Sequence, residues 1–132
     1  MEFVKYLLDT HTLLWAVQEP RRISVAVKDI IADESKELFV SSVSAYEVML
    51  KHRARKLTGF EYVAENYHEV LSTFGVKHLQ ITIDHAHKAG SLDWGHRDPF
   101  DRILAAQAVV DDLTLLTDDA AFDGLDWIKT LW

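Results

Sequence analysis

Residues 98–116 read DPFDRILAAQAVVDDLTLL, and this stretch contains both kinds of element from which the fold is built. Asp98 followed by Pro99 is typical of a helix start, because the carboxylate can cap the first turn and proline at the first helical position loses no hydrogen bond. Apolar side chains then recur at i, i+3, i+4 and i+8 from Phe100, which forms one stripe for packing against a sheet. The short apolar run at residues 114–116 is typical of a buried strand.

The same alternation of short apolar runs and longer helical segments continues along the chain. Strands are expected at residues 3–8, 37–42, 79–83, 114–116 and 127–130. Helices are expected at residues 12–18, 24–35, 43–53, 60–74, 85–92 and 99–112. Strands that alternate with helices pair in parallel through right-handed crossovers. The sequence therefore predicts an α/β fold, a three-layer α/β/α sandwich with a central parallel sheet.

The composition is that of a globular protein, with 132 residues of which 48% are hydrophobic and 27% charged. No stretch rich in Pro, Ser or Gly divides the chain, so we expect a single domain over residues 1–132. Cysteine is absent, which excludes disulfides, thiolate metal sites and cysteine nucleophiles and suits a reducing compartment. The longest apolar run, residues 13–17, is far shorter than the ~20 residues of a transmembrane helix. We expect a cytoplasmic protein with no membrane partner.

The formal net charge of −7 argues against a general attraction to nucleic acid. Any polyanion would have to be bound locally, by a limited set of basic side chains. The basic cluster at residues 51–56, together with Arg97 and Arg102, supplies the candidate phosphate contacts.

Acidic residues follow several of the predicted strands, at the sheet edge where open parallel sheets bind ligands. They are Asp9, Glu47, Asp98, Asp101, Asp118 and Asp119. Carboxylates gathered in one cleft repel one another and raise one another's pKa unless a cation neutralises them. Oxygen ligands without a His or Cys pair at ligand spacing favour Mg²⁺ or Mn²⁺ over zinc, and Mg²⁺ typically completes its coordination with substrate phosphate. One or two such ions could activate water for phosphodiester hydrolysis without a protein nucleophile.

Some of these acids also have structural explanations. Glu47 could be the acid of a capping box that begins at Ser44. Asp98 could serve only as the cap of its helix, which would leave Asp101 free as a ligand. Asp9 is the hardest to explain structurally, because a lone carboxylate at the end of a buried strand is costly without a partner.

The last acidic pair is ambiguous from spacing alone. One of Asp118 and Asp119 is expected to cap the short helix that runs through Phe122, and the other to face the cleft.

Four stretches of the sequence resemble, in order, the motifs of PIN-domain ribonucleases, and specifically the VapC-type toxins of bacterial toxin–antitoxin pairs. They are residues 7–15 (LLDTHTLLW), 43–48 (VSAYEV), 96–108 (HRDPFDRILAAQA) and 115–122 (LLTDDAAF). The resemblance covers nearly the whole chain. One departure is Tyr46, where this subgroup often carries another large aromatic residue, Trp.

The resemblance implies which residues bind metal. The family's metal-binding acids fall on Asp9, Glu47, Asp101 and Asp119, with Asp98 as a close neighbour. The family pattern Thr-x-Asp, met by Thr117 and Asp119, favours Asp119 over Asp118, and it makes Thr10 and Thr117 polar supports of the ligands. The resemblance further implies a Mg²⁺- or Mn²⁺-dependent endoribonuclease that forms a homodimer and is inhibited by a cognate antitoxin protein covering the cleft.

Two other functions are compatible with an acid after the first strand. An aspartyl-phosphate phosphatase or receiver-like domain shares this feature, but His11 stands where a companion acid is expected and no lysine follows the last strand in the required setting. A non-catalytic interaction module whose acids hold a structural ion is the other alternative.

Overall fold

The computed structural model describes residues 4–132 and contains a five-stranded sheet in which every neighbouring pair is parallel. The spatial order is β3-β2-β1-β4-β5, so the strand nearest the N-terminus lies at the centre. The strands are β1 (Lys5–Leu8), β2 (Glu37–Ser41), β3 (Lys77–Leu79), β4 (Thr114–Leu116) and β5 (Thr130–Leu131). This arrangement confirms the predicted α/β fold with a parallel sheet.

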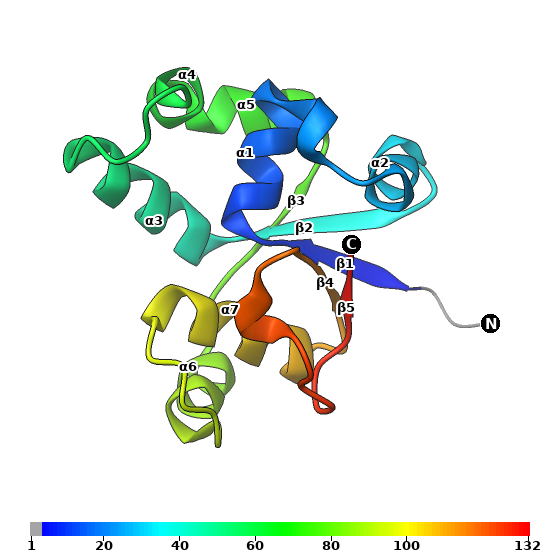
Figure 1. The fold of residues 1–132 in the computed structure, drawn as a ribbon, viewed down its shortest axis with the longest axis vertical. Helices are drawn as coiled ribbons and strands as arrows, with labels where there is room; N and C mark the ends of the chain where they lie inside the picture. Colours follow the sequence, from blue (N-terminus) through cyan, green and yellow to red (C-terminus); the bar gives the residue numbers. More distant parts are fainter. Residues whose placement is uncertain (1–3) are drawn as a thin grey trace.

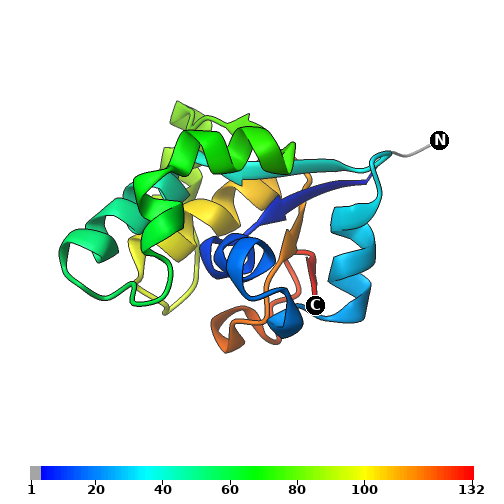
Figure 2. The same cartoon turned by 90° about the horizontal axis from the view of Figure 1, so that it is seen from above.

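Helices cover both faces of the sheet, with α1, α2 and α5 on one side and α6 and α7 on the other (Figure 1). The helices are α1 (Thr10–Gln18), α2 (Val25–Ala32), α3 (Ser42–Arg53), α4 (Glu61–Glu65), α5 (Tyr67–Phe74), α6 (Ile83–Ser91) and α7 (Pro99–Val110), with short 3₁₀ helices η1 (Pro20–Arg22) and η2 (Ala120–Phe122). Seen from above, the strands are rotated relative to one another, as the twist of parallel sheets requires (Figure 2). No helix in residues 4–132 combines the length and the apolar character needed to cross a membrane.

Successive residues of the central strand β1 point to opposite faces of the sheet and belong to the two halves of the core. Leu8 packs with Leu13 of α1 and Val27 of α2 on one face, whereas Leu7 packs with Leu104 of α7 on the other. All of these side chains are buried. The near-continuous apolar character of β1 therefore reflects a strand covered on both sides.

The position predicted for the third strand is wrong. Residues 79–83 were expected to form it, but β3 ends at Leu79 and residue 83 already begins α6. The cause is a capping box, in which the Thr82 hydroxyl accepts from the His85 N–H and the His85 ring accepts from the Thr82 N–H. Ile81 and Ile83 are exposed, so their alternation does not mark a buried strand face.

Other boundaries also differ from the prediction. The helix expected at residues 60–74 is two helices, α4 and α5, which are divided at Asn66. The last strand is shifted from residues 127–130 to Thr130–Leu131. The first strand begins at Lys5, and Phe3 of the predicted range 3–8 lies outside the described residues.

Candidate metal centre

A small polar cleft of about 60 Å³ lies where the segments that follow β1 and β4 meet α3 and the first half of α7. Its lining residues are Asp9, Thr10, His11, Glu47, Lys51, Asp98, Asp101, Leu104 and Asp119. Five acids named from the sequence therefore meet in one cleft. Asp118 is exposed and is not among the lining residues.

Asp9 follows β1 directly, and its carboxylate is held by two hydrogen-bond donors. It caps α1, since its Oδ1 accepts from the Thr12 N–H at 2.8 Å, and its Oδ2 accepts from the Thr117 hydroxyl. The side chain is only 6% exposed. Burial raises the pKa of Asp9, and the hydrogen bonds from Thr117 and Thr12 oppose this rise. The result is a fixed carboxylate whose charge is only partly compensated by the protein.

Glu47 lies on α3 and is buried, with Lys51 one turn later on the same helix. The Lys51 ammonium donates to Glu47 Oε2, which neutralises the carboxylate locally. The capping-box explanation of Glu47 is wrong, because the helix is capped by Ser41, whose hydroxyl accepts from the Val43 N–H. Glu47 therefore has no role at the end of its own helix.

Ser44, the other member of the expected capping box, is completely buried. Its hydroxyl is 2.9 Å from that of Thr10, a hydrogen bond that joins the start of α1 to α3 beside the cleft. Thr10 therefore joins two walls of the cleft, and within residues 4–132 its hydroxyl has no carboxylate partner.

Asp98 and Asp101 stand at the start of α7. Asp98 is the cap of this helix, as predicted, with Oδ1 accepting from the N–H groups of Phe100 and Asp101. Asp101 is not needed as a cap, and its Oδ2 lies 2.7 Å from His96 Nε2. Burial raises the pKa of Asp101 to about 6, with further increases from the charges of Asp98 and Asp119 and a decrease from the His96 hydrogen bond.

Asp119 combines the two roles that the sequence divided between Asp118 and Asp119. Its Oδ1 accepts from the Ala121 N–H and so caps η2, and the same residue lines the cleft. Its own N–H donates to the Thr117 hydroxyl, which in turn donates to Asp9. Thr117 therefore links the two acids that follow neighbouring strands.

The donor set fits a hard divalent cation. Among the described residues, ligand atoms of His96, Asp98 and Asp101 lie within 4.8 Å of one another. The charges of Asp98 and Asp119 raise the pKa of Asp101, a repulsion that a cation in the cleft would relieve. Carboxylate oxygens predominate, which favours Mg²⁺ or Mn²⁺ over softer metals.

Arg102 is not available as a phosphate contact, contrary to expectation. Its guanidinium donates to four backbone carbonyls, at distances of 2.7–3.0 Å. These acceptors are the carbonyls of Ala89, Leu92, Trp94 and His96. Arg102 thus fastens the connection between α6 and α7, whereas Arg97 is exposed.

His96 is the site residue that sequence reasoning missed. It belongs to the motif at residues 96–108, but nothing in the spacing indicates that its ring turns back to Asp101. The ring also packs on Trp94, with ring centroids 4.8 Å apart. The only available signal was its position five residues before an acid at a helix start.

Several solved structures share this fold over almost the whole chain. VapBC2 from Rickettsia felis, bound to a promoter DNA fragment, gives a TM-score of 0.70 at 15% identity, covering 98% of this chain and 99% of that one. DNA-bound VapBC from Salmonella typhimurium gives 0.70 at 18% identity, covering 98% of each chain. FitAcB from Neisseria gonorrhoeae gives 0.64 at 22% identity, covering 96% of each. These similarities show the fold.

A comparison with curated protein sequences gives no significant match. The sequence profile of the PIN domain, however, matches residues 6–128, which include every acid of the cleft. Together with the parallel sheet and the full-length structural matches, this shows that the chain belongs to the PIN-domain family.

Proposed function

We propose that this protein is a Mg²⁺- or Mn²⁺-dependent endoribonuclease and the toxin of a toxin–antitoxin pair. The observation that carries the proposal is the meeting of Asp9, Glu47, Asp101 and Asp119, from four separate segments, in one small cleft. Carboxylates are costly to gather in this way unless they bind cations. The PIN-domain match and the similarity to toxin–antitoxin complexes point to the same activity.

Asp9 and Asp101 would be the principal metal ligands, with Glu47 and Asp119 completing the site and Asp98 beside them. A bound divalent ion would supply Lewis-acid activation of water and stabilise charge on the phosphate. The hydrogen bonds from Thr117 and Thr12 fix the Asp9 carboxylate, and His96 fixes that of Asp101. Carboxylates held in this way would not have to reorient during the reaction, so the metal and the water that it activates would stay correctly placed.

Contacts to the RNA backbone would come from few cations, as the net charge of −7 requires. Lys51 lines the cleft and could exchange its contact with Glu47 for a phosphate oxygen. Arg97 is exposed next to Asp98, and Arg53, Arg55 and Lys56 are exposed at the end of α3. Lys51 lines the cleft and Arg97 adjoins Asp98, so these two side chains would hold the strand locally.

A protein partner is supported by an apolar stripe on α3. Tyr46, Met49 and Leu50 follow one another at helical spacing and are 64%, 43% and 46% exposed. Exposed stripes of this kind are typical of surfaces that another protein covers. We assign this region to the antitoxin or to the second subunit of a homodimer. The similarity of the chain to a toxin–antitoxin complex from Klebsiella pneumoniae supports such a partner.

Cleavage of a labelled single-stranded RNA by the purified protein tests the proposal. Activity should require Mg²⁺ or Mn²⁺ and stop with EDTA. Asp9→Asn and Asp101→Asn should each abolish it, while the matched control Asp118→Asn, an exposed acid outside the cleft, should not. Cleavage that persists in EDTA, or in both cleft variants, would overturn the mechanism. Metal binding without cleavage of any RNA would instead support the interaction module.

A further inference from the structure

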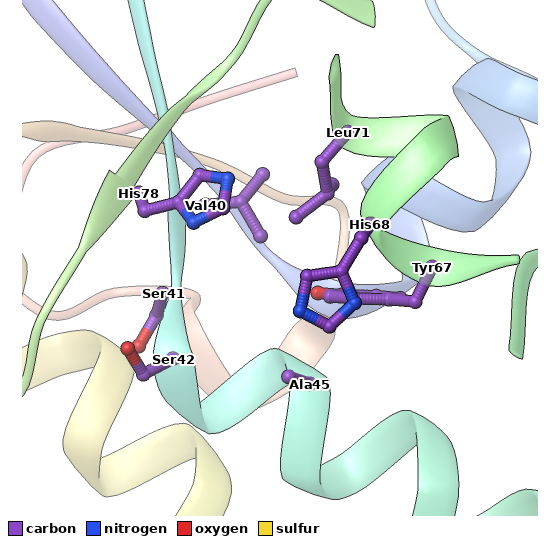
Figure 3. Close-up of a pocket in the computed structure, with 8 residues that line it drawn as sticks. All are labelled: Val40, Ser41, Ser42, Ala45, Tyr67, His68, Leu71 and His78. Atoms are coloured by element: carbon purple, nitrogen blue, oxygen red, sulfur yellow. The ribbon is translucent and has the colours of Figure 1, made fainter. Parts of the chain in front are cut away.

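A second cavity, of about 200 Å³, lies at the carboxyl end of β2 and shares no lining residue with the acidic cleft. Its walls come from β2, the start of α3, α5 and β3 (Figure 3). The proposed metal chemistry uses none of these residues, so the cavity needs an explanation of its own.

Tyr67 gives this cavity an unsatisfied polar group. Its hydroxyl oxygen is fully buried and has no hydrogen-bond partner among the described residues. Figure 3 shows the side chain extending from α5 towards the start of α3, along the cavity. Burial raises the pKa of Tyr67, so the hydroxyl stays protonated and can donate. A buried hydroxyl without a partner is costly, which favours a ligand that supplies an acceptor.

Two imidazole rings face the same space. His68 reaches it from α5 and His78 from the edge strand β3, and both are exposed (Figure 3). Val40 and Leu71 supply apolar wall between them. Flat rings beside an apolar wall, with polar groups at the edges, suit a planar heterocycle that stacks and forms hydrogen bonds in one plane. Proteins bind unstacked RNA bases in this way, on Tyr and His rings.

The cavity and the acidic cleft lie on the two sides of α3. Ala45 of this helix lines the cavity, while Glu47 lines the cleft. Both sites lie at the same edge of the sheet, because β2 and β1 are parallel neighbours whose carboxyl ends carry Ser41 and Asp9. A helix is about 10 Å across, which is roughly three nucleotides of a stacked strand. One single strand could therefore reach both sites.

We propose that the cavity bounded by Tyr67, His68 and His78 binds one nucleobase of a single-stranded RNA whose phosphodiester lies in the acidic cleft. The base accepts a hydrogen bond from the Tyr67 hydroxyl and stacks against the imidazoles. The inference rests on the proposed ribonuclease function. It makes this cavity the site that selects which base stands at a fixed number of nucleotides from the cleaved phosphodiester.

The test uses full-length protein with Asp9→Asn to prevent cleavage, and follows the His68 and His78 side chains by NMR. The probes are the four nucleoside 5′-monophosphates, a single-stranded RNA decamer and inorganic phosphate. At least one nucleotide and the decamer should shift both imidazoles saturably. Tyr67→Phe should weaken binding about fivefold, the loss of one hydrogen bond. Tyr62→Phe, an exposed tyrosine of α4 outside the cavity, is the matched control and should bind as before.

Three results would overturn the inference: no imidazole shift with any nucleotide or RNA, equal affinity in Tyr67→Phe, or identical shifts with inorganic phosphate, which would mark an anion site. Tyr67→Phe should not lower stability, because the hydroxyl has no partner to lose, and His78→Ala on the exposed edge strand provides a second variant. RNA cleavage without nucleotide binding here would overturn this inference alone. Nucleotide binding in a protein that cleaves no RNA would overturn only the ribonuclease function.

Discussion

Replacing Asp101 with asparagine should stabilise the metal-free protein at neutral pH, although the same change removes a proposed metal ligand. Burial, together with the charges of Asp98 and Asp119, raises the pKa of Asp101 from 3.8 to about 6. At 1.36 kcal/mol per pH unit, this change corresponds to roughly 3 kcal/mol of unfavourable free energy in the ionised state. Partial exposure, and the lost attraction between the carboxylate and the start of α7, reduce the expected gain to about 1–2 kcal/mol.

The pH dependence follows from the same change in pKa. Between pH 3.8 and about 6 the folded protein binds this proton more tightly than the unfolded chain. Stability therefore falls as the pH rises through this window, and the asparagine variant escapes the loss. Its advantage should be complete above about pH 6 and should vanish below about pH 4. Added Mn²⁺ should reverse the order, because a ligand that binds only the folded state stabilises it by about 2.7 kcal/mol at 100 times its Kd.

Urea unfolding followed by circular dichroism, in EDTA at pH 4 and 7.5 and in Mn²⁺ at pH 7.5, measures each of these quantities. Asp118→Asn, at an exposed position beside the cleft acids, should match the wild type throughout. A variant Asp101→Asn that is no more stable than wild type in EDTA at pH 7.5 would refute the argument that the cleft stores electrostatic repulsion. An equal response of both proteins to Mn²⁺ would refute the role of Asp101 as a ligand.

Two further substitutions probe groups that hold the site together. Thr117→Val removes a buried donor to Asp9, so the unfolding free energy should fall by about 1.5–3 kcal/mol. The affinity for Mn²⁺, measured by calorimetry, should fall at least tenfold. An unchanged affinity would show that Thr117 does not support the ligand. Arg102→Met leaves four carbonyls without their donor, so it should lower the free energy of unfolding in urea by about 2–4 kcal/mol. The exposed control Arg97→Ala should change this free energy by less than about 0.5 kcal/mol. Equal stability of these two arginine variants would contradict the structural role of Arg102.

Local signals were sufficient where one element determines its own boundaries. Asp98 and Pro99 mark the start of α7 because cap and proline act within a single turn. They were insufficient at residues 79–83, where alternating apolar residues imitate a half-buried strand. There the cap formed by Thr82 and His85 decides in favour of a helix, and only the tertiary structure reveals that Ile83 is exposed.

The acids of the cleft were predictable because their chain positions, at strand ends and a helix start, fix where they lie in a parallel sheet. The partners of these acids were harder to predict. His96 contacts Asp101 from the loop before α7. Arg102 holds this loop in place, because it donates to backbone carbonyls of α6 and of the loop itself. Contacts of a side chain with distant backbone leave no periodic trace in a sequence.

The outer strands of the sheet affect how this molecule can assemble. β3 has three residues and β5 has two, so each edge offers very few free main-chain groups. Lys77 at the start of β3 adds a charge, paired with Glu37, that disfavours a neighbouring strand. Sheet extension from one molecule to the next, the usual route to fibrillar aggregation, is therefore blocked at both margins. Under the proposed function, in which an antitoxin covers the protein, such protection would keep the uncovered protein from irreversible self-association.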